Sequence, residues 1–228
     1  MSPSDPARSQ FCPRLAGFLF LWLIVSGVGG AWLVSDVAGS GELADVARRV
    51  AAHEHLYRLG LVLELVETLS AVLLGFALYA TLRRVDGPLA LLAMIWRVAE
   101  ALLGAIAILF AFTRLRLYTG GGPSEPLIAL TRGAGSAAHD FAVLCFSFGS
   151  LLFFWLFWRS RSIPRILSGI GILASVLVAV IGFADLLAPE LSGFLQYGWA
   201  PMALAEVGGG LWLLVKGANF NDMEATRE

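Results

Sequence analysis

Long apolar stretches fill this sequence of 228 residues. A helix needs about 20 mainly apolar residues to cross the hydrocarbon core of a bilayer. Six stretches approach that length, and we expect spans at roughly residues 14–35, 57–82, 88–113, 133–158, 164–187 and 194–216. An α-helix satisfies its own backbone hydrogen bonds inside lipid. The sequence therefore predicts an all-α integral membrane bundle of six transmembrane helices.

Composition leaves no room for a soluble domain. The chain is 58% apolar and only 14% charged, whereas soluble proteins average about 25% charged residues. We expect a cytoplasmic tail over residues 1–13, a transmembrane domain over 14–217 and a second cytoplasmic tail over 218–228. The first apolar stretch is too long for a signal peptide and lacks a convincing small-residue cleavage site, so we interpret it as an uncleaved span. Cys12 and Cys145 are too few for a disulfide framework and are expected to be free thiols.

The charge balance argues against nucleic acid as a partner. The formal net charge is −1, and no basic run exceeds two residues, so the chain lacks the basic surface that binds phosphate backbones. The expected partners are the lipid bilayer and a small-molecule solute. Neither a cofactor nor an oligomeric state can be read from the sequence.

Residues 40–57 form the most polar periodic segment. Leu43, Val46 and Val50 recur at helical spacing, and we place Asp45 and Arg49 together on the opposite face. This pattern predicts an amphipathic helix at the membrane interface. The other long connection is expected at residues 114–132, with a short turn near residues 127–130.

Basic residues in the short loops predict the orientation. With the N-terminus in the cytoplasm, nine Lys and Arg residues lie on the cytoplasmic side, six lie on the other, and Arg97 is buried in a span. The nine are Arg8, Arg14, Arg83, Arg84, Arg159, Arg161, Arg165, Lys216 and Arg227, and the six are Arg48, Arg49, Arg58, Arg114, Arg116 and Arg132. The tightest loops fall on the side with more Lys and Arg, so both termini are expected in the cytoplasm. The expected location is the inner membrane of the cell.

Four charged residues lie deep inside the second and third expected spans, at least seven residues from either end. Glu64 and Glu67 share a face of the second, and Arg97 and Glu100 share a face of the third. A charge at the bilayer centre costs about 2.5–3.5 kcal/mol, so these residues need one another or a water-filled cavity. We predict that Arg97 pairs across to Glu67 or Glu64 and not only with Glu100 on its own helix.

Three further polar residues extend this candidate site. His139 and Asp140 open the fourth span, and Glu206 lies in the sixth between Pro201 and three glycines. A carboxylate in an interrupted helix is typical of transporter binding sites, although Gly and Pro are also ordinary in spanning helices. Together the seven residues predict an outward-opening polar cavity for a ligand or a proton.

The carboxylates outnumber the cations in these spans. Five of them (Glu64, Glu67, Glu100, Asp140 and Glu206) face one permanent cation, Arg97, so some must be protonated, hydrated or bound to a cation. Protonation favours a proton-coupled small-solute transporter or a channel-like protein. A bound metal at His139, Asp140 and Glu64 would indicate an intramembrane metal-dependent enzyme, and a purely structural network would indicate a scaffold or accessory subunit. No nucleotide-binding, zinc-protease or serine-hydrolase motif is present, so an enzyme is the less favoured reading.

Several short runs resemble one bacterial family. They are His55-Leu56-Tyr57-Arg58-Leu59-Gly60, Arg97-Val98-Ala99-Glu100, His139-Asp140, Ile163-Pro164-Arg165-Ile166-Leu167 and Trp212-Leu213-Leu214-Val215-Lys216-Gly217. The chain after Pro13 resembles the six-span membrane family catalogued as domain of unknown function 4386, with Ser168 where we expect that family's glycine. The resemblance implies architecture and location. It carries no activity and no functional residues.

Overall fold

The computed structural model describes residues 6–120, 124–187 and 196–220. These residues are almost entirely helical, which confirms the all-α class. The elements are α1 (Pro6–Ala38), α2 (Leu43–Ala52), α3 (Glu54–Leu82), α4 (Gly87–Thr119), α5 (Glu125–Ser160), α6 (Arg165–Leu187), the 3₁₀ turn η2 (Gln196–Trp199) and α8 (Ala200–Lys216).

Five helices in the described residues are long and apolar enough to cross a membrane. They are Gln10–Ala38 within α1, and α3, α4, α5 and α6. The sixth expected span is not confirmed, because α8 has 17 residues and at 1.5 Å per residue reaches about 25 Å, short of a hydrocarbon core of about 30 Å. These five apolar helices indicate a multi-pass membrane protein.

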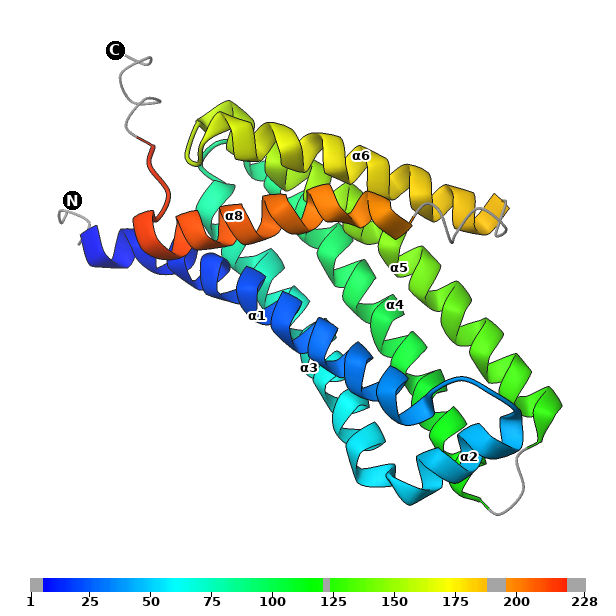
Figure 1. Cartoon of the computed structure of the whole chain (residues 1–228). Helices are drawn as coiled ribbons and strands as arrows, with labels where there is room; N and C mark the ends of the chain where they lie inside the picture. Colours follow the sequence, from blue (N-terminus) through cyan, green and yellow to red (C-terminus); the bar gives the residue numbers. More distant parts are fainter. Residues whose placement is uncertain (1–5, 121–123, 188–195, 221–228) are drawn as a thin grey trace, which may run out of the picture.

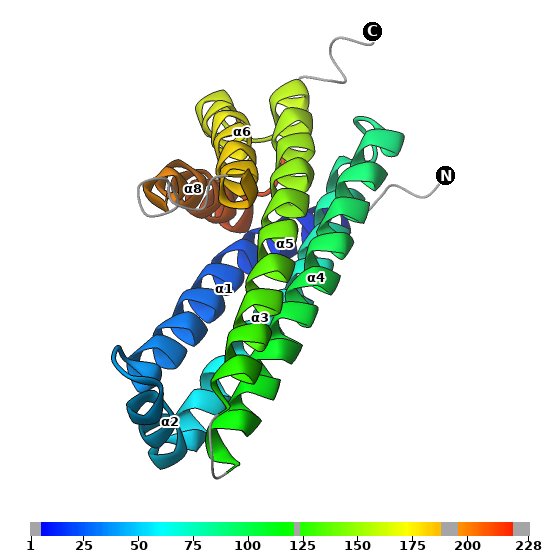
Figure 2. The ribbon, with the colours of Figure 1, turned by 90° about the vertical axis from the view of Figure 1, so that its right-hand side faces the viewer.

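The helices form a bundle that is open toward one end. α1, α3, α4 and α5 run alongside one another, and α6 and α8 cross them at a steep inclination (Figures 1 and 2). The beginning of α1, the end of α8 and the α3–α4 and α5–α6 turns lie at the same end of the molecule (Figure 1). An ion pair of 3.1 Å between Arg159 and Asp86 ties the two turns together.

Glycines allow the closest helix crossings. A Cβ on Gly17 of α1 would lie 2.6 Å from the carbonyl oxygen of Gly210 on α8, and one on Gly30 would lie 2.8 Å from the carbonyl oxygen of Gly60 on α3. Helices in lipid gain from such contacts because small residues let the backbones approach. α1 is therefore held against α8 near its start and against α3 near its end.

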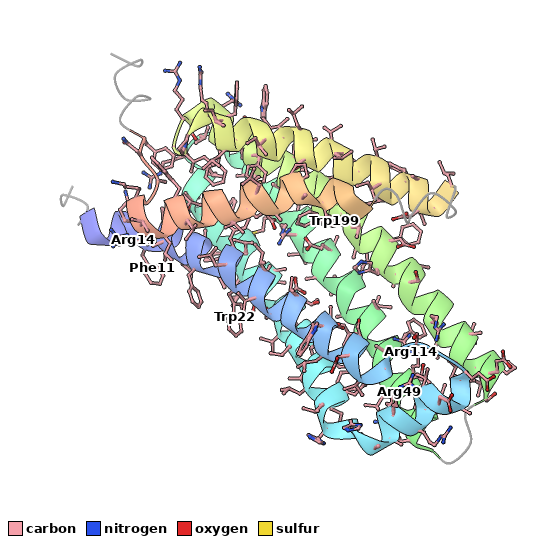
Figure 3. The ribbon with its side chains drawn as sticks, viewed as in Figure 1. Phe11, Arg14, Trp22, Arg49, Arg114 and Trp199 are labelled. Atoms are coloured by element: carbon pink, nitrogen blue, oxygen red, sulfur yellow. The ribbon has the colours of Figure 1, made fainter. Side chains whose placement is uncertain are left out.

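An amphipathic helix is confirmed within the expected segment of residues 40–57 as α2, although it ends at Ala52 and α3 begins at Glu54. Its buried residues Ala47 and Val50 pack in a cluster with Tyr57 and Leu115. Asp45 forms an ion pair with Arg48, three residues along the same helix. The Arg49 guanidinium instead donates to the carbonyl oxygens of Ala38, at 3.0 and 2.6 Å, and Ser40, at 2.9 Å, and so caps the end of α1 (Figure 3).

Two expected element boundaries are wrong. The helix of the first span was expected to begin at residue 14, but α1 begins at Pro6 and contains Pro13, which removes one backbone donor without ending the helix. The expected connection at residues 114–132 is mostly helical, because α4 continues to Thr119 and α5 begins at Glu125. The expected turn near residues 127–130 is the first part of α5. Flexible stems let arginines near a helix end carry their charge outward, so they do not stop a helix.

The outer surfaces suit contact with lipid. Large apolar side chains are exposed along the spans, including Leu69, Leu73 and Phe76 on α3 and Leu102 and Leu109 on α4. Such contiguous apolar faces are costly in water. They support association with a lipid bilayer.

Candidate functional site

A cavity of about 330 Å³ lies among α1, α3, α4, α5 and α8. Five of the seven candidate site residues line it. They are Glu67, Arg97, Glu100, His139 and Glu206. Most of the remaining wall is apolar. It includes Phe20, Leu23, Ile24, Val28, Ala71, Leu74, Ala101, Ala142, Val143, Phe146, Trp199 and Met202.

Arg97 is the most enclosed of these charges. The residue is 2% exposed, and its guanidinium forms a 3.0 Å ion pair with Glu100 and lies 5.1 Å from the ring centre of Phe146. The ion pair lacks hydrogen-bond geometry, because both Arg97 Nε and Glu100 Oε2 are buried without a hydrogen-bond partner. One donor, Arg97 Nε, and one acceptor, Glu100 Oε2, can therefore form a hydrogen bond with a ligand or a water molecule.

Two glycines make room for the Arg97 side chain. A Cβ on Gly75 of α3 would lie 3.0 Å from Arg97 Cβ, and one on Gly149 of α5 would lie 3.3 Å from Arg97 Cδ. Larger residues at either position would press on the arginine stem. The close packing of α3 and α5 against α4 thus holds the guanidinium in place.

The predicted pairing of Arg97 with the second span is wrong. In the described residues the ion pair of Arg97 is with Glu100, three residues along its own helix, a spacing that places side chains side by side. Glu67 instead accepts a hydrogen bond of 3.2 Å from the Thr68 hydroxyl and lies against Gly27 of α1. Glu67 and Arg97 were predicted to pair because they lie at similar depth and carry opposite charge. They line the same cavity but form no ion pair with each other.

Glu206 enters the cavity from a continuous helix. Pro201 occupies the first turn of α8, where its missing N–H is harmless, and Gly208, Gly209 and Gly210 continue the helix to Lys216. The expected interruption of the last span is therefore wrong over residues 200–216. Glu206 forms no ion pair or hydrogen bond with the described residues, and its charge interacts with those of Arg97 and Glu67.

The cavity charges form one interacting group. Glu100 interacts electrostatically with Arg97, Glu67 and Glu206, and Glu67 interacts with Arg97. Three carboxyl groups therefore share one guanidinium in a mostly apolar enclosure. Since the low dielectric penalises unpaired charge, this group can hold a proton or bind a cation.

Glu64 and Asp140 lie away from the cavity. Glu64 packs against Gly30 of α1 and interacts electrostatically with Glu67 and Arg114. Asp140 is partly exposed on α5 and interacts with His139 and with Asp185 near the end of α6. The structure thus brings five of the seven predicted site residues together.

The alternative metal site is not assembled. Across residues 6–120, 124–187 and 196–220, no three His, Cys, Asp or Glu side chains are grouped as metal ligands require. His139 and Asp140 are neighbours on α5, while Glu64 lies on α3 against α1. Adjacent residues on a helix point in different directions, which is unfavourable for binding one ion.

The cavity opens between α1, α5 and the start of α8. Val28, His139 and Ala203 line it and are all exposed, Val28 by 67%. α1 and α8 touch near Gly17 and Gly210 and separate away from that point (Figure 1). Trp199 lies at the beginning of α8, beside this opening (Figure 3). The opening lies on the half of the bundle away from the chain termini.

The apolar part of the site was not predicted. Phe20 of α1, Phe146 of α5 and Met202 of α8 look like ordinary lipid-facing or core residues in the sequence. Which apolar side chains flank a charge depends on how the helices cross, and one sequence does not reveal this.

One family model matches this chain. The family is described as Domain of unknown function (DUF4386), and its model matches residues 15–217. No curated protein and no solved structure matches the chain.

Proposed function

The chain belongs to the DUF4386 family, whose description assigns no activity, and we propose from the geometry above that it is a small-solute transporter or channel-like protein coupled to protons. The solute occupies the cavity around Arg97. The carboxyl groups of Glu67, Glu100 and Glu206 exchange protons as the solute enters and leaves.

One observation carries this proposal. A mostly apolar cavity of about 330 Å³ contains three interacting carboxyl groups and one buried arginine, and two of their polar atoms have no hydrogen-bond partner. An intramembrane charge is expensive and marks a substrate or proton pathway by default. A network that only pins helices would satisfy its own polar atoms and leave no cavity beside them.

The proposal places the protein in the inner membrane of the cell. It has six spans, and both termini lie in the cytoplasm. α8 is short, but it lies between α1 and α6 and ends beside the start of α1 (Figure 1), as a tilted last span returning to the starting side would. Residues 14–217 then form the membrane domain, and residues 1–13 and 218–228 form the tails.

Single cysteines, introduced after Cys12 and Cys145 are replaced by serine, test this topology. Arg83→Cys and Gly120→Cys change exposed residues at opposite ends of the bundle. In intact cells a membrane-impermeant maleimide should label Gly120→Cys and spare Arg83→Cys until the membrane is opened. Labelling of both from outside, or of Arg83→Cys alone, contradicts the proposed orientation.

A ligand screen tests solute binding. The purified full chain is melted in the presence of short carboxylates, aliphatic and aromatic amines, amino acids and polyols, because a ligand that binds only the folded state raises the melting temperature. Ala203→Trp fills the exposed rim of the cavity, and Leu204→Trp adds the same indole on a residue that is 58% exposed and does not line it.

At least one class of ligand should raise the melting temperature of the wild type and of Leu204→Trp. The same ligands should not raise the melting temperature of Ala203→Trp. An equal response in both variants places binding elsewhere. If no class stabilises the wild type, the polar residues hold helices together and the transport proposal falls.

A further inference from the structure

The unequal charge of the cavity points to the kind of solute that it takes. Arg97 already has an anionic partner at 3.0 Å and a ring beneath its guanidinium. Glu206 has neither an ion pair nor a hydrogen bond within the described part of the chain. An anionic solute would therefore compete with Glu100 for Arg97, whereas a cationic solute would meet carboxyl groups that lack a cation.

Buried atoms beside the cavity supply an independent indication. Glu100 Oε2 is a buried acceptor without a hydrogen-bond donor, and Arg97 Nε is a buried donor without an acceptor. A protonated amine carries the donors that the carboxylate oxygen lacks. A water molecule bound to the amine, or a hydroxyl of the solute, can serve Arg97 Nε.

The walls select the rest of the solute. Phe20, Phe146 and Trp199 contribute aromatic surface, and the other wall residues are mainly aliphatic. Apolar walls favour an apolar body of matching size, and aromatic faces attract a cation that has left water. A small inorganic cation gains nothing from these walls.

We propose that the solute is a small amphipathic organic cation, a protonated amine on an apolar body, which binds with its amine among Glu206, Glu67 and Glu100. This inference rests on the proposed function and specifies its solute. The amine enters as the cation, and a carboxyl group of the cavity releases one proton to the water as it becomes the carboxylate that pairs with the amine. The net charge of the cavity with the bound amine therefore equals that of the empty cavity.

The groups that face this exchange come from four helices. They are Glu67 on α3, Arg97 and Glu100 on α4, His139 on α5 and Glu206 on α8. Outside the cavity, Glu64 of α3 interacts with Glu67, and the Cys145 thiol of α5 interacts with Glu100. α1 contributes only apolar residues and Gly27 to the wall, and α6 contributes none. Glu206 is the residue to change first because it has no hydrogen-bond or ion-pair partner to lose in the described structure.

Three probes of similar size separate the alternatives. Phenethylammonium is a cation at neutral pH, 2-phenylethanol is neutral and phenylacetate is an anion. Binding to the full chain in nanodiscs is measured by calorimetry in two buffers of different ionisation enthalpy, which also gives the number of protons released. Glu206→Gln is compared with Glu125→Gln, a change at an exposed carboxylate at the start of α5, and Ala203→Trp reports whether binding is in the cavity.

The cation should bind at least about tenfold more tightly than the alcohol, as a partly buried charge pair of 1.4 kcal/mol or more would give, with release of about one proton. Glu206→Gln should reduce this preference to about threefold or less and abolish proton release, and Glu125→Gln should change neither. Glu67→Gln, tested as a second variant, should lower cation affinity in the same direction.

Other outcomes overturn the inference in distinguishable ways. If phenylacetate or 2-phenylethanol binds as tightly as the cation and Ala203→Trp blocks it, the cavity binds solutes but the cationic class is wrong. If the cation binds equally to Ala203→Trp, its site is elsewhere on the protein or in the lipid. If no probe binds and the broader ligand screen is also negative, the proposed function falls together with the inference.

Discussion

Replacing Arg97 by methionine tests the polar centre of the bundle. Methionine keeps a flexible apolar stem in the space beside Gly75 and Gly149 but leaves Glu100 without its cation. At 3.0 Å and an effective dielectric of about 20, the attraction is about 5.5 kcal/mol. Desolvation offsets part of this in the native pair, so we expect Arg97→Met to lower the free energy of unfolding by about 3–5 kcal/mol, as for other broken buried pairs.

Double-mutant cycles identify the partner. Unfolding is followed by helical circular dichroism as mixed micelles are enriched in a denaturing detergent, for the wild type, Arg97→Met, Glu100→Gln, Glu67→Gln and the two double variants. The Arg97–Glu100 cycle should give a coupling of about 1–3 kcal/mol, within the range for residues in contact. The Arg97–Glu67 cycle should give a smaller value, because these residues share a cavity without an ion pair. A larger coupling to Glu67, or none to Glu100, refutes this account of the charge centre.

Two further predictions concern the frame that holds the cavity. Asp86→Ala removes both the cap on the Leu89 N–H of α4 and the ion pair to Arg159, and it should lower stability by about 1–2 kcal/mol in the same unfolding assay; an unchanged midpoint would contradict a capping role. Gly17→Leu should separate α1 from α8 and lower the melting temperature, whereas Gly29→Leu, where an added Cβ meets nothing within 4 Å, should leave it nearly unchanged. Equal effects of the two glycine changes would contradict the close crossing.

Much of the fold could be predicted because lipid restricts the alternatives. Apolar stretches long enough to span a bilayer can only be helices when they are not part of a barrel, so α3 and α6 match their expected spans closely. α2 was equally predictable, since its apolar residues recur at helical spacing. These elements depend on local pattern and environment, and both are visible in one sequence.

The missed features depend on packing between distant segments. Pro201 and the glycines at 208–210 suggested a broken helix, yet Pro201 lies in the first turn of α8, and Gly208 and Gly210 let α8 approach its neighbours. The candidate carboxyls were found because charge is rare in spans. Their pairing was missed because Arg97 could reach Glu100 on its own helix or Glu67 on the next, and the crossing of α3 and α4 decides between them.

Proton movement driven by a solute gradient tests the central claim most directly. The full chain is reconstituted in liposomes that contain a pH-sensitive dye, and a gradient of the solute that most stabilises it is imposed across the membrane. The account predicts a change of internal pH that requires the gradient, is lost in Glu206→Gln and is retained in Glu125→Gln. A wild type that binds the solute but moves no protons, or a Glu206→Gln variant that moves them at the wild-type rate, would contradict it.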